Sequence, residues 1–313
     1  MIVYNYKLGT KITSGGHCAV AVGFFDGVHL AHRELIHTAI DEARRRGIPA
    51  GVFTFSSESG IKSSRSRIYT TEERLGIIES LGVDFAVVCD FASIRDVSGR
   101  DFVREVLVGD LGVSVAVSGF NFNFGKNAES GATDFVKYMS EAGGEAIIIE
   151  PRMFAGRPLS SSMIREFLSV GKVESAAAAL GAPFFVTGEV DRGWELGRKL
   201  GFPTANIAEA AGRVKLKRGV YRCAVKIGNR LYHAITNIGV CPTFDERDSH
   251  YETHILNYSG NLYGKKITLY FLGYLREERH FDSPEKLKEQ IAVDKYRAKE
   301  ENGDTLWQEI GLS

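Results

Sequence analysis

Two histidines stand three residues apart in a glycine-rich segment, GFFDGVHLAH at residues 23–32, directly after an apolar run. The run predicts a buried strand, and the segment predicts the turn that leads from its carboxyl end into a helix, where ligands of parallel sheets bind. Gly23 and Gly27 let the backbone approach a ligand closely. Helix N-terminal amides and the imidazoles of His29 and His32 would converge on an anion, which suits a triphosphate. The alternative is that the histidines merely end a strand and begin a helix.

A second glycine-rich segment, GWELGRKLGFPTAN at residues 193–206, combines a loop that can cradle phosphate with a rigid PTAN end. The hydroxyl of Thr204 and the amide carbonyl of Asn206 are hard oxygen donors. Together they could hold a Mg²⁺ ion whose other ligands are waters and phosphate oxygens. Taken alone, residues 203–206 are equally typical of a turn.

The first segment resembles the GxFDGxHxGH signature of the nucleotidyltransferase superfamily, and in particular the adenylyltransferase module of bacterial bifunctional riboflavin kinase/FAD synthetases. SSSMIR at residues 160–165 resembles the SSTxIR segment of that family, and GFNFNFG at residues 119–125 resembles its loop beside the nucleotide. The resemblance implies that a phosphate oxygen of FMN attacks the α-phosphorus of ATP and that pyrophosphate leaves.

The resemblance also implies roles for single residues. His29 and His32 would be the catalytic donors to phosphoryl oxygens, Arg165 would hold the pyrophosphate, and Asp26 would shape the turn. The nucleotide and phosphate contacts implied for this module are Gly23, Phe25, Asp26, Gly27, Asn121, Ser161, Ser162 and Arg165.

Two positions of the first module differ from the family pattern. Ala31 stands where the family usually has glycine, and the TFEPHP segment of the family is TFSSES at residues 54–59, with Glu58 in place of its histidine. Three alternatives therefore stay open for this module: a weak or degenerate adenylyltransferase, a nucleotide-binding or regulatory module, and a transferase with another acceptor.

The second glycine-rich segment resembles the riboflavin kinase signature, and further motifs follow in the order of that family at residues 239–244, 251–255, 262–264 and 273–276. The resemblance covers nearly all of residues 184–300. It implies that the ribityl hydroxyl of riboflavin attacks the γ-phosphorus of ATP with Glu252 as the general base. Thr204 and Asn206 would be the Mg²⁺ ligands. The implied nucleotide and phosphate contacts are Gly193, Gly197, Lys199, Gly201, Thr204, Asn206 and Arg276.

The elements that must position these residues follow two patterns. From residue 18 to residue 180, short apolar runs alternate with amphipathic segments, which predicts a doubly wound parallel sheet of the α/β class with helices on both faces. Thr70 and Glu73 predict a capping box at the start of one helix. After residue 181, strand-like segments separated by Gly, Asn and Asp predict a mostly antiparallel β-barrel, followed by a C-terminal helix that begins near Pro284. We place the domain boundary at residues 182/183.

Composition excludes several classes of protein. The 313 residues include 39 Lys+Arg and 39 Asp+Glu, so the formal net charge is zero and neither nucleic acid nor an anionic membrane is expected as a partner. No apolar run reaches the roughly 18 residues of a membrane span. The four widely separated cysteines predict reduced thiols rather than disulfides or a zinc site. We therefore expect a cytoplasmic location and small-molecule partners, namely ATP, riboflavin and FMN, and self-association stays open.

Overall fold

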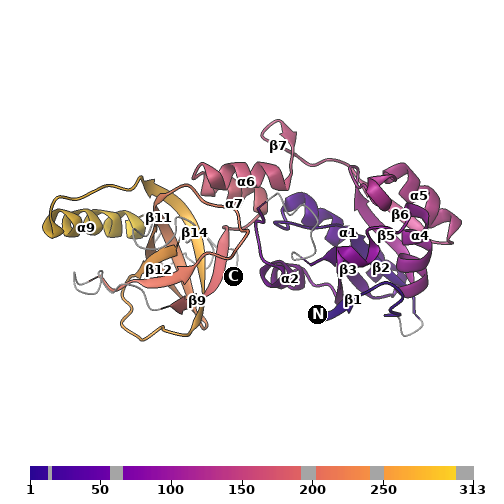
Figure 1. Ribbon diagram of the computed structural model, residues 1–313, viewed down its shortest axis with the longest axis horizontal. Coiled ribbons are helices and arrows are strands. Elements are labelled where there is room, and N and C mark those ends of the chain that lie inside the picture. The colour runs from indigo at the N-terminus through magenta and orange to yellow at the C-terminus, as the bar shows by residue number, and fades with distance from the viewer. Residues whose placement is uncertain (13–15, 57–65, 192–201, 240–249, 301–313) are drawn as a thin grey trace. The chain divides into compact units, whose positions relative to one another are not determined.

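The computed structural model describes residues 1–12, 16–56, 66–191, 202–239 and 250–300 of the chain. The chain divides into two compact units, Met1–Ser161 and Ser162–Ser313. Figure 1 shows that one unit is of the α/β class and that the other contains a β-barrel.

The first unit is built on a six-stranded sheet with the order β1-β4-β3-β2-β5-β6. Every neighbouring pair of strands is parallel. The central strand β2 (CAVAV) is buried along its whole length, as a strand with helices on both sides of the sheet must be. The strands are β1 (Ile2–Tyr6), β2 (Cys18–Val22), β3 (Ala50–Phe55), β4 (Phe85–Cys89), β5 (Val113–Gly119) and β6 (Glu145–Ile149).

Helices cover both faces of this sheet. One face packs against α1 (Leu30–Arg46) and α2 (Thr71–Ser80). The other face packs against η1 (Phe102–Asp110), a π-helix, and α5 (Ala132–Glu141). The shorter elements are α3 (Phe91–Ile94), α4 (Gly99–Asp101), the 3₁₀ helix η2 (Lys126–Ala128) and a hairpin of β7 (Met153–Phe154) and β8 (Arg157–Pro158).

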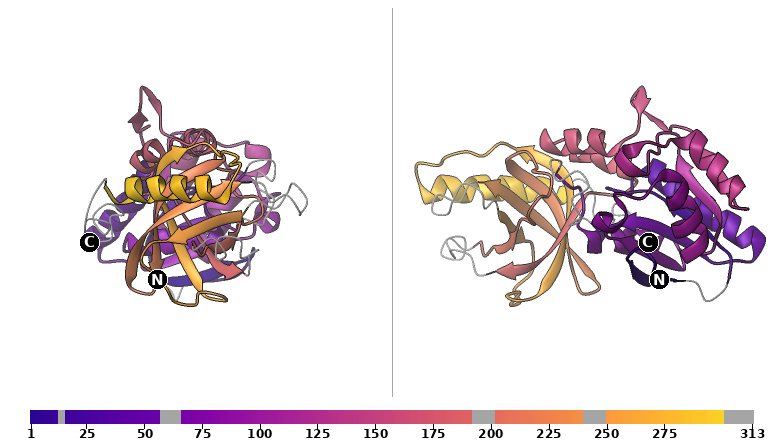
Figure 2. Two further views of the ribbon diagram at one scale, coloured as in Figure 1. Left: turned by 90° about the vertical axis from the view of Figure 1, so that its left-hand side faces the viewer. Right: turned by 45° about the vertical axis from the view of Figure 1, so that its right-hand side comes forward.

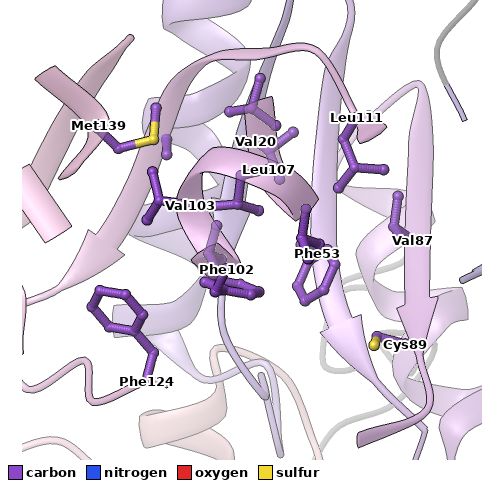
Figure 3. Close-up of a cluster of buried hydrophobic side chains, with 14 of the residues drawn as sticks. Val20, Phe53, Val87, Cys89, Phe102, Val103, Leu107, Leu111, Phe124 and Met139 are labelled. Carbon is purple, nitrogen blue, oxygen red and sulfur yellow. The ribbon is translucent and has the colours of Figure 1, made fainter. Parts of the chain in front are cut away.

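A large apolar cluster fills the space between the sheet and η1 (Figure 3). Phe53 from β3 contacts Phe102 from η1 edge to face, with ring centroids 5.6 Å apart. Val20, Val87 and Leu107 are fully buried in the same cluster. This core fixes the carboxyl ends of β2 and β3, where the glycine-rich turn begins.

The second unit contains a closed antiparallel barrel with the strand order β10-β13-β12-β11-β14-β9. Its strands are β9 (Phe185–Asp191), β10 (Ala205–Ala208), β11 (Gly219–Ile227), β12 (Arg230–Gly239), β13 (His250–Ile255) and β14 (Lys266–Arg276). Helix α6 (Ser161–Ser169) leads into this unit and is followed by α7 (Val173–Leu180), which contacts β14. The last described helix is α9 (Pro284–Glu300).

Side chains of the barrel strands alternate between its inside and its outside. On β13, Tyr251, Thr253 and Ile255 are buried, whereas Glu252 between them is exposed. Thr236 and Thr253 share a hydrogen bond of 3.0 Å, and neither is accessible to solvent. The alternation therefore turns Glu252 to the outer surface of the barrel.

Helix α9 lies across the outside of the barrel, as the left view of Figure 2 shows. Ala298 belongs to a buried apolar cluster with Val220 of β11 and Ile235 of β12. A buried ion pair adds to this contact, because Arg276 Nη2 at the end of β14 lies 2.8 Å from Asp294 Oδ2.

The predicted fold class is confirmed in both units, and so is the capping box of Thr70 and Glu73. Four strands were not predicted: the two-residue strands β7 and β8, and the strands β1 and β10. β1 lies at the edge of the sheet and buries only Tyr6, so it lacks an apolar run. β10 has four residues, and its first two belong to the PTAN segment, whose composition predicts a rigid segment or a turn.

The division into compact units falls at Ser161/Ser162, directly after the first residue of α6. The pattern of apolar runs changes later, at residues 182/183. No described helix is long and apolar enough to cross a membrane. The described cysteines Cys18, Cys89 and Cys223 are free and buried, and Cys241 lies outside the described residues.

Candidate active sites

The turn after β2 has an unusual backbone. Phe25, Gly27 and Val28 all have positive φ angles, of 54°, 89° and 42°. Only glycine adopts this region without strain, so the conformation at Phe25 and Val28 must be held by surrounding contacts. One of these is the hydrogen bond from Val28 N to Phe25 O, 3.1 Å long. The turn ends at His29, the N-cap residue of α1.

His29 and His32 lie against each other at the N-terminus of α1. Their rings are stacked, with centroids 3.6 Å apart and planes inclined by 17°. His29 Nδ1 accepts a hydrogen bond of 3.4 Å from the backbone N–H of His32. A neutral imidazole that accepts at Nδ1 carries its proton on Nε2 and can donate it to a ligand.

Burial decides the charge of His29. The side chain is 3 % exposed, and the loss of water around it lowers the pKa of His29 to about 4. At neutral pH His29 is therefore an uncharged hydrogen-bond donor. The positive potential at this site comes from the free amides of the helix N-terminus.

Asp26 is buried in the same turn and bonds to two other segments. Its Oδ1 accepts from Ile68 N at 3.0 Å, and its backbone carbonyl accepts from Ser161 Oγ at 2.7 Å. These bonds agree with the turn-shaping role expected for Asp26. They also place Ser161, the first residue of α6, directly beside the turn.

The sequence did not reveal two residues that bind the backbone of this turn. Arg74 Nη1 and Thr54 Oγ1 both donate to the carbonyl of Phe24, at 2.8 and 3.0 Å. Arg74 is 1 % exposed although it lies on the helix α2. The only signal in the sequence was the capping box, which fixes the start of α2 and hence the face on which Arg74 lies.

Asn121 lies in the turn that follows β5. It is exposed, and its carbonyl accepts from Asn123 Nδ2 at 3.0 Å. Phe122 and Phe124 stack on each other with centroids 5.0 Å apart, which anchors the loop to the core under η1. The loop therefore presents Asn121 at the carboxyl edge of the sheet that also carries His29.

Ser162 and Arg165 belong to the second unit. Arg165 Nη2 donates to Ser162 Oγ at 3.2 Å, one turn earlier on α6. Their assignment to phosphate stays a prediction.

The register of the barrel brings Asn206, Glu252 and Asn237 into one row across three strands. Glu252 pairs with Asn206 of β10 on one side and with Asn237 of β12 on the other. Directly paired residues of antiparallel strands project to the same face with Cβ atoms roughly 5 Å apart. Asn206 also pairs with Asp191 of β9. The structure thus brings together two of the predicted residues, Asn206 and Glu252, and adds Asn237.

The pKa of Glu252 is raised. The main cause is loss of solvation near the barrel wall, and the negative charge of Glu278 adds to it, whereas His250 acts in the opposite direction. Asn237 Nδ2 lies 3.5 Å from Glu278 Oε1, which keeps Glu278 beside the row. A carboxylate with a raised pKa is a better proton acceptor than an ordinary one.

Thr204 follows a backbone segment that a histidine holds in place. His254 Nδ1 lies 2.9 Å from the carbonyl of Pro203, to which it must donate because that oxygen only accepts. The ring of Phe202 meets His254 edge to face, with centroids 5.6 Å apart. The role of His254 was not expected from the sequence, although it stands in the motif that contains Glu252.

Arg276 was expected to contact phosphate. Its Nε and Nη2 donate to the carboxylate of Asp294, and its Nη1 donates to the carbonyl of Glu277 at 3.0 Å. This guanidinium therefore joins β14 to α9, and its contact with phosphate stays a prediction.

Several predicted site residues lie outside the described residues: Gly193, Gly197, Lys199 and Gly201 of the glycine-rich loop, and Ser57, Glu58 and Ser59 of the altered segment. Among the described residues, no cluster of three or more His, Cys, Asp or Glu side chains could hold a metal ion. A metal in the barrel unit would therefore depend on oxygens such as those of Thr204 and Asn206, together with oxygens of its substrate.

Comparison with known proteins assigns the two parts of the chain to two families. Residues 11–163 match the FAD synthetase family and residues 180–301 match the riboflavin kinase family. Bifunctional riboflavin kinase/FMN adenylyltransferase from Bacillus subtilis is 32% identical over 288 residues, which cover 89% of this chain and 90% of that protein. The protein of the same description from Escherichia coli is 31% identical and covers 90% of this chain and 92% of its own.

A solved structure is also similar over almost the whole chain. This protein, described as a macrolide-efflux protein from Streptococcus pneumoniae, is 28% identical and superposes with a TM-score of 0.86 over 96% of this chain and 100% of its own. The order of the two family matches and the full-length similarity lead to one conclusion. The chain belongs to the family of bifunctional riboflavin kinase/FMN adenylyltransferases.

Proposed function

We propose that this chain phosphorylates riboflavin to FMN in its barrel unit and adenylylates FMN to FAD in its α/β unit, with ATP as the donor in both reactions. The observation that carries this proposal is the presence, in one chain, of both family matches, one over residues 11–163 and the other over residues 180–301. We assign the adenylyltransferase to residues 1–182 and the kinase to residues 183–313.

In the adenylyl transfer, a phosphate oxygen of FMN forms a bond to the α-phosphorus of ATP while the bond to the β-phosphate oxygen breaks. The reaction needs no protein nucleophile, so the protein must position the substrates and stabilise developing charge. His29 is suited to this because it is neutral, its Nε2 carries a proton, and its ring is fixed against His32. Arg165 and the α6 serines would bind the departing pyrophosphate.

In the kinase reaction, the ribityl hydroxyl of riboflavin attacks the γ-phosphorus of ATP and ADP leaves. Glu252 would orient the hydroxyl and accept its proton, for which its raised pKa is favourable. Asn206 and Asn237, on either side of Glu252 in the barrel register, would orient the substrates. The phosphate contacts would come from the glycine-rich loop with Lys199, and from Arg276.

Mg²⁺ fits this site through the chemistry of its donors. Thr204 and Asn206 supply the hydroxyl and carbonyl oxygens that Mg²⁺ prefers, and the remaining ligands would be waters and phosphate oxygens. The ion would neutralise phosphate charge in the kinase reaction. We further propose a cytoplasmic location, which the free thiols of Cys18, Cys89 and Cys223 support.

A second candidate function is a riboflavin kinase whose α/β unit binds nucleotide without transferring it. The observation that favours it is Glu58, which stands where the family has a histidine. A carboxylate near phosphate would weaken adenylyl transfer by repulsion.

Separation of flavin products distinguishes the two functions. The purified chain would be incubated with riboflavin, ATP and Mg²⁺, and riboflavin, FMN and FAD separated by chromatography. We expect FMN followed by FAD, with neither formed when a chelator removes Mg²⁺. FMN alone would favour the second candidate, and the absence of both products would contradict the proposed function.

A further inference from the structure

The turn that carries His29 is contacted by a buried cation from another helix, Arg74 of α2. Two of its non-glycine residues, Phe25 and Val28, have positive φ angles. Such conformations persist only where neighbouring contacts over-determine them, and they cluster where a site requires an exact placement of groups. The contacts that hold Phe24, immediately before this strained segment, are therefore the ones on which the position of His29 depends.

Phe24 is held by an unusual set of contacts. Its carbonyl accepts from both Arg74 Nη1, at 2.8 Å, and Thr54 Oγ1, at 3.0 Å. The guanidinium of Arg74 also lies 4.9 Å from the centroid of the Phe24 ring, in the geometry of a cation–π contact. Arg74 Nη2 donates to the carbonyl of Phe55, the last residue of β3. One side chain thus joins the ends of β2 and β3.

Arg74 itself is firmly placed. It is 1 % exposed and follows Glu73, whose capping box with Thr70 fixes the first turn of α2. Burial lowers the pKa of Arg74 to about 10, while the nearby carboxylate of Asp26 acts to raise it. The side chain is therefore charged at neutral pH. Its charge faces the buried Asp26, whose own bonds to Ile68 and Ser161 hold the middle of the turn.

We propose that Arg74 is a positioning residue for adenylyl transfer: its planar guanidinium clamps the carbonyls of Phe24 and Phe55 and thereby sets the placement of His29 at the start of α1. A guanidinium is required for this task because it can donate to two carbonyls in fixed directions while stacking on a ring. A lysine has the same charge but presents it as a point. The inference rests on the proposed adenylyltransferase function.

The test compares Arg74→Lys, which keeps the charge, with Thr54→Val, which keeps the shape but removes the other bond to Phe24 O. The matched control is Arg46→Lys at the opposite end of α1, where Arg46 pairs with Glu42 and Glu145 at the surface. The 17 residues of α1 separate Arg46 from His29, at the other end of the helix, by roughly 25 Å. FMN formation by the barrel unit of the same molecules serves as an internal control.

We expect Arg74→Lys to lower kcat for FAD formation by about 10- to 100-fold, the range for a small misplacement of a catalytic group. Thr54→Val should lower it by a smaller factor. In both variants KM for ATP should change much less than kcat, and the rate of FMN formation should match the wild type. The control Arg46→Lys should form FAD at the wild-type rate. An unchanged kcat in folded Arg74→Lys would overturn the proposal, and so would a loss of activity that only follows the fraction of unfolded α/β unit.

A second measurement does not depend on FAD formation. NMR titration of the His29 ring in the wild type and in Arg74→Lys reports the burial of His29 directly. Release of the turn should admit water and raise the pKa of His29 from about 4 toward the ordinary value of 6.5. An unchanged His29 titration would overturn the proposal even if the wild type formed no FAD, whereas the absence of FAD in the wild type would count against the proposed adenylyltransferase alone.

Discussion

The pKa values of His29 and Glu252 illustrate how loss of solvation affects the two proposed sites, although His29 is buried and Glu252 lies at the barrel surface. Each is shifted toward its uncharged form because loss of water penalises charge, so the pKa of the histidine falls and the pKa of the carboxyl rises. For His29 the result is a neutral donor at the pH of the cell. For Glu252, the proposed general base, the result is a pKa closer to neutral pH. The same physical cause thus supports two different reactions.

Desolvation raises the pKa of Glu252, and the negative charge of Glu278 raises it further. A base must be deprotonated, so the kinase rate should fall on the acid side as Glu252 becomes protonated. Glu278→Gln should lower the pKa of Glu252 and move this acid limb of kcat/KM to lower pH. The control is Glu277→Gln, since Glu277 pairs with Lys217 instead. Coincident pH profiles for wild type and Glu278→Gln would contradict the role of Glu252 as the base.

The oxygen of Thr204 provides a second prediction. Thr204→Val keeps the shape of the side chain but removes a ligand for Mg²⁺, so the Mg²⁺ concentration for half-maximal FMN formation should rise severalfold. Thr204→Ser keeps the hydroxyl and should stay near the wild type. If the valine variant had the same Mg²⁺ dependence as the wild type, Thr204 would be a turn residue only.

The low pKa of His29 provides a third prediction, because it couples stability to pH. The folded α/β unit keeps His29 neutral down to about pH 4, whereas the unfolded chain protonates it near pH 6.5, so acid favours unfolding. Between these two values this residue should remove about 3 kcal/mol from the free energy of unfolding.

Urea unfolding followed by native methyl NMR signals of Val20 and Val115 would measure this effect in the α/β unit. His29→Gln cannot titrate, so the difference in unfolding free energy between wild type and variant should change by that amount from pH 7 to pH 4. A difference that does not depend on pH would show that His29 is not buried as a neutral ring.

At the scale of elements, the attachment of α9 to the barrel rests on the pair of Arg276 and Asp294, which are 10 % and 2 % exposed. Asp294→Asn would leave a buried guanidinium without its counter-charge, which costs about 3–5 kcal/mol. Asp282→Asn removes an exposed pair with Lys286 and should cost at most about 1 kcal/mol. Urea unfolding, followed by the methyl signals of Leu269 in the barrel, would compare them. Equal costs would contradict a structural role for this ion pair.

The elements also show what the sequence can and cannot predict. Strands such as β2 and β11 were predicted because short apolar runs bounded by turn residues are typical of strands, and the order of these runs along the chain indicated the fold class. β1 was missed because an edge strand buries little, and β10 because four residues hold no periodicity. Arg74 was missed for a different reason: a charged residue on a helix is normally exposed, and only tertiary contacts show that its charge is enclosed.

Each unit has its own core, and each of the two proposed sites has its own set of residues. The α/β unit positions His29 and His32 with parallel strands and a helix N-terminus, whereas the barrel positions Asn206, Glu252 and Asn237 by antiparallel register. The two reactions therefore depend on different residues. A change in one site should leave the other reaction intact.

The most direct test of two separate active sites measures two variants, each with two substrates. Glu252→Gln and the double variant His29→Ala, His32→Ala would each be supplied with ATP and Mg²⁺ and either riboflavin or FMN, and initial rates of FMN and FAD formation would be measured. Glu252→Gln should form FMN at least about 10²-fold more slowly than the wild type but convert FMN to FAD at the wild-type rate. The double variant should form FMN normally and no FAD. Equal losses of both reactions in either folded variant, or normal FAD formation without the two histidines, would contradict two separate active sites.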